Sequence, residues 1–111
     1  MPERLTGEPL VVPETELSVA TVEQTADYLR LRCVGEIDQS TAGLFAEALA
    51  AAVPGRRRVE VDLSKVTFMD SSGINALVQQ RTPECELVLI KVPPRIRRVL
   101  EITALDHIFC P

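Results

Sequence analysis

The fold is decided in the stretch Val66-Thr67-Phe68-Met69-Asp70-Ser71-Ser72-Gly73-Ile74, where an apolar strand leads directly into a helix. Leu77 and Val78 continue the apolar pattern of that helix. Backbone N–H groups without intrahelical partners gather at a helix N-terminus, and the helix dipole is positive there. The sequence therefore places the hydroxyls of Ser71 and Ser72 on a rigid turn that tolerates added negative charge.

A hairpin and a helix precede this stretch. Residues 17–22 and 28–34 alternate as two strands do, with a polar break between them. Residues 59–63 predict a short buried strand just before the strand at 66–69. Between hairpin and strand lies a helix that Asp38 or Ser40 would cap. It ends at Val53-Pro54-Gly55, and its apolar residues recur at helical spacing, namely Leu44, Phe45, Ala48, Leu49 and Ala52.

The C-terminal third continues the alternation of helix and strand. Thr82-Pro83-Glu84 breaks the helix, residues 87–90 predict another buried strand, and Pro94 opens a further helix. Ile108-Phe109 is expected to form a closing strand. Parallel strands need such crossover helices, whereas the leading hairpin is antiparallel. We therefore predict an α/β fold with a small mixed β-sheet of four to five strands and helices packed on it.

Composition limits the class of protein. With 111 residues, 46% of them hydrophobic, the chain has room for one core, and we expect a flexible arm at 1–14 and one domain at 15–111. The net charge of -4 argues against nucleic-acid binding. No apolar run is long enough for membrane insertion. Three widely spaced cysteines fit a reducing, cytoplasmic setting better than a disulfide framework.

Three ordered motifs carry a resemblance to a known family. Gly35-Glu36-Ile37-Asp38, Asp62-Leu63-Ser64 and Phe68-Met69-Asp70-Ser71-Ser72-Gly73-Ile74 resemble, in order and spacing, the anti-sigma-factor antagonists of the STAS fold. The resemblance spans about Leu17 to Phe109. It implies a partner-switching protein that binds an anti-sigma-factor serine kinase and frees a sigma factor. It also implies inactivation by phosphorylation of Ser71 and reactivation by a PP2C-type phosphatase, with no cofactor in this chain.

The resemblance also assigns roles at the switch. Ser72 is expected to cap the helix, and Asp38 and Asp70 flank the phosphoacceptor. The expected partner-binding residues are Asp38, Asp70, Ser72, Gly73, Ile74 and Asn75. Asn75 stands where the family often has a small residue, and the helix after the motif is about a turn shorter than usual. Both departures bear on which partner binds and how tightly.

Other interpretations of the same residues remain open. Ser71 and Ser72 can simply cap the helix, and the fold can serve as a scaffold or accessory subunit of a larger complex. An enzyme is not expected, because His107 is the only histidine and no nucleophile elbow surrounds Ser71. No metal site is expected either, and the arginines at 56–58 and at 95, 97 and 98 are interpreted as solvated.

Overall fold

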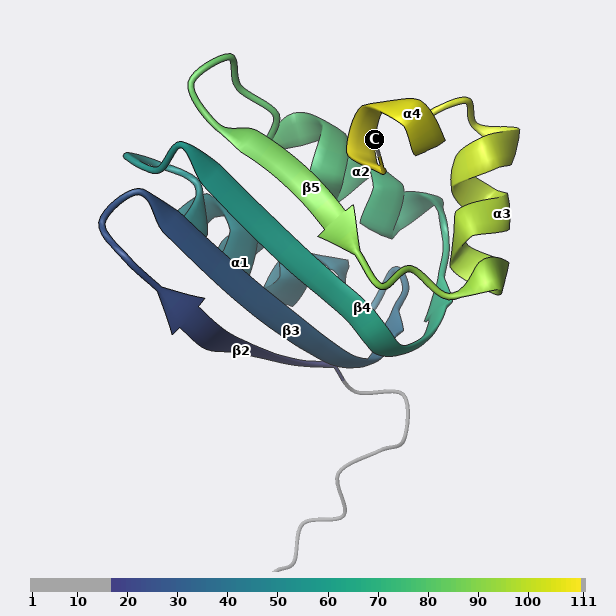
Figure 1. Cartoon of the computed structure of the whole chain (residues 1–111). Helices are drawn as coiled ribbons and strands as arrows, with labels where there is room; N and C mark the ends of the chain where they lie inside the picture. Colours follow the sequence, from purple (N-terminus) through teal and green to yellow (C-terminus); the bar gives the residue numbers. More distant parts are fainter. Residues whose placement is uncertain (1–16, 111) are drawn as a thin grey trace, which may run out of the picture.

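The computed structural model describes residues 17–110, and within them the chain forms a mixed four-stranded sheet in the order β2-β3-β4-β5 (Figure 1). The β2–β3 pair is antiparallel, and β3–β4 and β4–β5 are parallel. The predicted mixed sheet is therefore confirmed, whereas the arm predicted at 1–14 lies outside the described residues. The strands are β2 (Ser18–Gln24), β3 (Tyr28–Ile37), β4 (Arg58–Met69) and β5 (Glu86–Ile90).

The decisive strand is longer than predicted. The segments at 59–63 and 66–69 were expected as separate strands, but β4 runs through both of them. The apolar alternation breaks between them because the β3–β4 register shifts between Arg32 and Val34. At the shift the buried Asp62 carboxylate accepts a hydrogen bond of 2.9 Å from the Ser64 N–H. A local turn within a continuous strand thus replaces the predicted gap.

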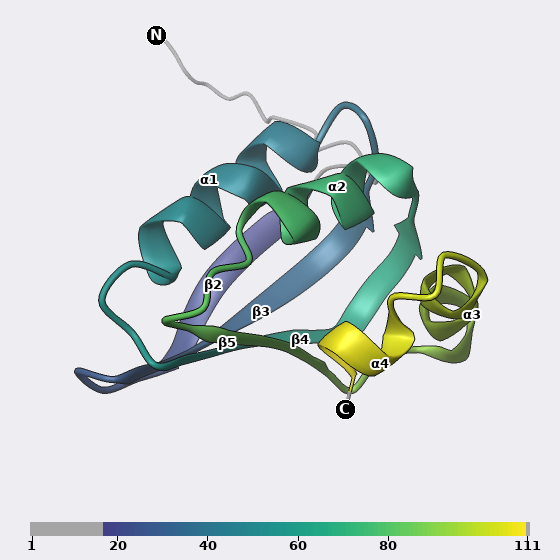
Figure 2. The same cartoon turned by 90° about the horizontal axis from the view of Figure 1, so that it is seen from above.

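Helices cover one face of the sheet. Figure 2 shows α1 (Ala42–Ala52) and α2 (Ser71–Gln79) side by side on that face, with α3 (Pro94–Ile102) beside the end of β4. The strand predicted at Ile108-Phe109 is wrong, because these residues belong to the short helix α4 (Asp106–Phe109). Their N–H groups bond to the Leu105 carbonyl, and this turn buries Phe109 without any strand partner.

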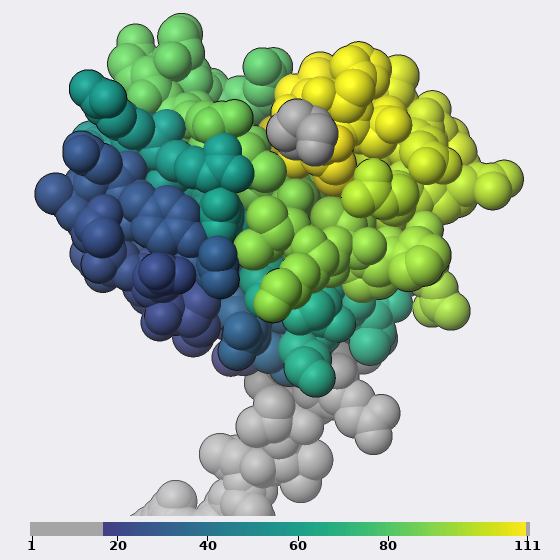
Figure 3. Space-filling view, viewed as in Figure 1, coloured from purple at the N-terminus to yellow at the C-terminus, as the bar shows by residue number. Residues whose placement is uncertain are grey.

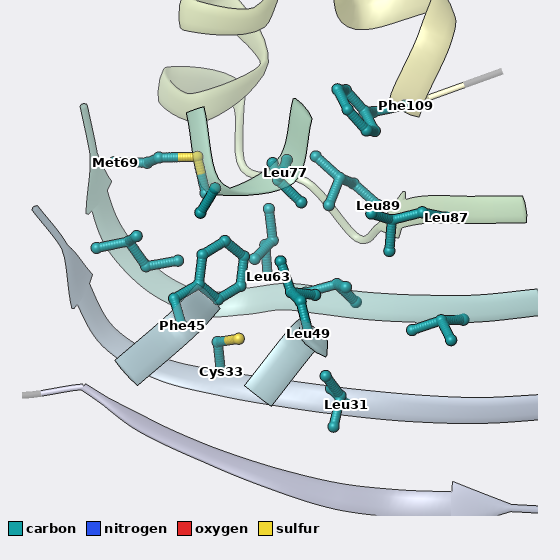
Figure 4. Packing of buried hydrophobic residues seen from close by; sticks show 14 of the residues in the cluster. Leu31, Cys33, Phe45, Leu49, Leu63, Met69, Leu77, Leu87, Leu89 and Phe109 are labelled. Atoms are coloured by element: carbon teal, nitrogen blue, oxygen red, sulfur yellow. The ribbon is translucent and has the colours of Figure 1, made fainter. Parts of the chain in front are cut away.

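The core lies between the helices and the sheet (Figure 4). Each strand sends alternate side chains into it, and α1, α2 and α4 close it from above. Cys33 lies fully buried at its centre, and burial raises the pKa of this thiol to about 12. The fully buried apolar side chains include Phe45, Leu49, Leu63, Leu77, Leu100 and Phe109.

Figures 1 and 3 show that no helix of the described residues covers β2 and β3 on the opposite face of the sheet. Charged side chains lie on that face, among them Arg30, Arg32 and Arg58 in ion pairs. Glu60 lies at the centre of this face and accepts hydrogen bonds from Tyr28 (2.7 Å), Arg30 (3.0 Å) and Arg58 (2.9 Å). Burial opposes its charge, but these hydrogen bonds outweigh burial and hold the pKa of Glu60 below its usual value. Arg58 is therefore part of an ion-pair network rather than simply solvated.

Candidate functional site

The predicted site residues meet where two parallel strands end. The carboxyl ends of β3 and β4 lie at the same edge of the sheet, so the loops into α1 and α2 are neighbours (Figure 2). The Asp70 N–H donates to the Ile37 carbonyl over 3.2 Å and ties the two loops together. Asp38 follows Ile37 directly, and Ser71 follows Asp70. The structure thus brings the two motifs together at one edge.

Asp70 is the N-cap of α2, with an extended backbone. Its Oδ1 accepts hydrogen bonds from the Ser72 N–H over 2.9 Å and from the Ser72 hydroxyl. The prediction that Ser72 caps the helix is therefore wrong, because Ser72 lies within the first turn and its hydroxyl donates instead of accepting. Ser71 is exposed at the first helical position, and its hydroxyl has no hydrogen-bond partner among residues 17–110.

Gly73 allows α2 to approach the sheet closely. A Cβ at this position would lie 2.7 Å from Ile37 Cγ2 and 2.9 Å from Met69 Cγ. Ile74 follows and is buried in the core. Gly73 and Ile74, which were expected in the partner-binding set, are therefore buried in the packing beneath Ser71 rather than exposed beside it.

Asp38 organises the turn before α1. Its Oδ1 accepts hydrogen bonds from the Ser40 N–H (2.9 Å), the Ser40 hydroxyl (2.7 Å) and the Thr41 N–H (3.2 Å). The hydrogen bond from the Ser40 side chain is the main reason that the pKa of Asp38 is lowered. The N-cap position of α1 is Thr41, which makes no side-chain cap hydrogen bond, so neither Asp38 nor Ser40 occupies the expected position. Asp38 instead caps the turn that leads into α1, because its side chain accepts from the Ser40 and Thr41 N–H groups.

Two apolar side chains lie on the surface where the sequence predicted core. Leu44 in the first turn of α1 and Val78 near the end of α2 are 48% and 44% exposed. Val78 shares a face of α2 with Ser71 and Asn75, which is also exposed, because the three are spaced four and three residues apart. Each apolar residue adjoins a fully buried one, Phe45 or Leu77, and successive helical positions differ by about 100°. This rotation away from a buried neighbour was the signal in the sequence that could have identified Leu44 and Val78 as exposed.

The described part of the chain, residues 17–110, offers no group of three or more His, Cys, Asp or Glu side chains arranged for a metal ion. It also contains no helix that is both long enough and apolar enough to cross a membrane. The site therefore consists of an exposed hydroxyl, two hydrogen-bonded carboxylates and exposed apolar side chains. Such a set suits binding and modification of the serine.

Comparison with known proteins matches residues 20–110 to the family described as Mlab, STAS domain. The anti-sigma-B factor antagonist of Listeria monocytogenes is 34% identical over 97 residues, covering 83% of this chain and 85% of that protein. The chain belongs to the STAS-domain anti-sigma-factor antagonists.

Solved structures agree with this placement of the STAS domain. An anti-sigma factor antagonist from Mycobacterium paratuberculosis superposes with a TM-score of 0.73 at 28% identity, covering 91% of this chain and 88% of that one. SpoIIAA from Bacillus in its phosphorylated form gives a TM-score of 0.62 at 19% identity, covering 82% and 87%. The second likeness shows the shared STAS fold alone.

Proposed function

We propose that this STAS domain binds an anti-sigma-factor serine kinase in the bacterial cytoplasm, frees a sigma factor, and is inactivated by phosphorylation of Ser71. It acts by binding and not by catalysis. The observation that carries the proposal is the contrast between two adjacent hydroxyls. Ser71 is exposed and unbonded within the described residues, whereas Asp70 holds the hydroxyl of Ser72. A kinase that reaches this turn therefore finds one free acceptor.

The position of Ser71 suits a phosphate. Ser71 is the first residue of α2, where free N–H groups and the helix dipole favour negative charge. A phosphate would add about -1.5 to -2 charges beside Asp70 and near Asp38. Modification thus changes the charge of the surface while leaving α2 in place. In support, SpoIIAA, which shares the fold, has been solved in a phosphorylated form.

The neighbourhood of Ser71 suits a protein partner. Leu44 is exposed on α1, and Asn75 and Val78 are exposed on α2. Both helices begin at the edge of the sheet that carries Ser71. Apolar side chains within a polar surround are typical of the core of a protein interface. A phosphate introduced beside such a contact would have to be desolvated on binding, so it opposes association. A PP2C-type phosphatase then restores binding.

The first experiment is intact mass spectrometry on protein from the native host, with and without phosphatase treatment, followed by mapping of any phosphate. We expect one phosphate, on Ser71. Ser71→Ala removes it, whereas Ser72→Ala, the matched control, retains it. A protein that carries no phosphate under any growth condition would contradict the switch.

Binding separates the switch from the scaffold or accessory subunit that the fold also allows. For a switch, Ser71→Asp and Ser71→Glu abolish binding to the kinase encoded in the same host, and Ser71→Ala binds permanently. A scaffold tolerates all three substitutions equally. The measurement is co-purification of the kinase with each variant.

A further inference from the structure

One edge of the molecule carries unlike charges that do not pair with each other. The acidic patch consists of Glu36, Asp38 and Asp70, and none of them has a basic partner among residues 17–110. The basic patch consists of Arg95 and Arg98, exposed one turn apart on α3, and they form no ion pair with a described carboxylate. On the open sheet face, by contrast, Arg30, Arg32 and Arg58 all pair with carboxylates.

The two patches lie on either side of an exposed aromatic ring. Arg95 donates to the Thr67 carbonyl over 3.4 Å, which places the start of α3 against β4 three residues before Asp70 (Figure 2). Phe68 lies between these positions in β4 and is 41% exposed. It pairs in register with Glu36 on β3. Acidic patch, Phe68 and basic patch therefore follow one another along this edge.

We propose that this edge binds a second copy of the chain through a two-fold contact. Under a two-fold axis every contact occurs twice: if residue i of one copy touches residue j of the other, residue j of the first copy touches residue i of the second. A surface with an acidic patch on one side of the axis and a basic patch on the other is therefore complementary to itself. With the axis beside Phe68, the acidic patch of each copy faces Arg95 and Arg98 of the other. The two phenyl rings bury each other at the centre.

The chemistry favours a second copy over a nucleic acid. The chain has a net charge of -4, so a polyanion is repelled by most of the molecule. A second copy brings its acidic patch opposite Arg95 and Arg98 and its own arginines opposite the acidic patch, so the charges within the contact attract. Surface ion pairs contribute little individually, so we expect a weak dimer with a dissociation constant in the micromolar to millimolar range.

Sedimentation velocity over a concentration series tests the dimer on purified, unmodified full-length protein, so the result does not depend on phosphorylation of Ser71. Arg95→Glu combined with Arg98→Glu sets like charges against each other twice, and the dissociation constant should rise roughly tenfold. Glu36→Lys should weaken the dimer in the same direction. Arg57→Glu, an exposed charge reversal at the other end of β4, is the control and should change nothing.

Mixing the variants decides between a two-fold contact and other arrangements. When the double arginine variant is combined with labelled Glu36→Lys protein, one contact of the mixed dimer restores the wild-type pairing of the acidic patch with Arg95 and Arg98. In the other contact the Glu36→Lys substitution sets a positive charge against the reversed arginine positions, although Asp38 and Asp70 still face them. We therefore expect a heterodimer tighter than the dimer of the double arginine variant. Three results would each overturn the proposal. The wild-type protein could stay monomeric at millimolar concentration, the mixture could dimerise no more tightly than the double arginine variant alone, or species larger than a dimer could form.

Discussion

Gly73 shows how a single missing methyl group positions the switch. Its Cβ would come within 3 Å of Ile37 and Met69, both buried, so Gly73→Ala must push α2 away from the sheet. We expect a loss of about 1–3 kcal/mol in the free energy of unfolding. Urea denaturation measures it. Gly43→Ala on α1 is the matched control, because a Cβ there meets nothing within 4 Å, and it should be neutral or stabilising.

Asp70 gives a second prediction at this scale. Asp70→Ala removes the acceptor of the Ser72 N–H and hydroxyl, and we expect a loss of about 1 kcal/mol in unfolding free energy. Asp70→Asn keeps an N-cap acceptor and should lose little by the same denaturation measurement. Equal losses for the two variants would show that the carboxylate charge, and not capping, is what α2 needs.

The residue scale also shows what sequence patterns leave undetermined. The motif placed Ser71 and Ser72 at a helix start, and the structure confirms that junction. The prediction named Ser72 instead of Asp70 as the N-cap of α2, because Asp and Ser are nearly equivalent N-cap residues by propensity. The choice depends on where the first helical turn begins, and that is fixed by the Asp70 hydrogen bond to Ile37 on another strand. No local pattern records a contact between residues 33 positions apart.

Elements were predictable where the apolar period was regular. The hairpin, α1 and the helix opened by Pro94 all repeat their apolar residues cleanly and were correctly predicted. The gap inside β4 and the strand at Ile108-Phe109 were wrong for different reasons. In β4 the polar Ser64 and Lys65 interrupt the apolar alternation, although the strand continues through a register shift. At Ile108-Phe109, two apolar residues in a row fit a strand or a helical turn equally well, and only their tertiary partners decide between the two.

The turn inside β4 makes the element sensitive to pH. Burial tends to raise the pKa of Asp62, but hydrogen bonds from Ser64 and Arg32 and the charge of Lys91 outweigh it and lower the pKa. A carboxyl whose pKa is lower in the folded state stabilises the fold above its unfolded pKa of about 4 and loses that contribution as the pH falls further.

Asp62→Asn tests this directly. We expect the variant to be less stable than the wild type at pH 7 by about 1 kcal/mol, because Arg32 loses its anionic acceptor. The difference should shrink as the pH falls below about 4, where the wild-type carboxyl also becomes protonated. Denaturation from pH 7 down to pH 3 measures it. A difference that stays constant over this range would rule out the titration of Asp62 as the cause.

At the scale of the whole molecule, the two faces of the sheet differ in how they are held together. One face is an apolar core under the helices, and alternation in the sequence predicted it. The other face is joined by a charged network that runs from Glu23 on β2 to Glu86 on β5. Its bonded partners lie up to 32 residues apart, between Tyr28 and Glu60, so composition revealed the charges but not their pairing.

Glu60 is the junction of that network and therefore its most sensitive member. Its side chain is 12% exposed and accepts from Tyr28, Arg30 and Arg58, so Glu60→Gln leaves two guanidiniums facing each other without an anion between them. We expect a loss of about 1–2 kcal/mol in the free energy of unfolding. Glu86→Gln is the control, since that side chain is 59% exposed and pairs with Arg58 alone, and it should cost less than about 0.5 kcal/mol. Urea denaturation of both variants separates a network centred on Glu60 from a set of independent surface pairs, for which the two losses would be equal.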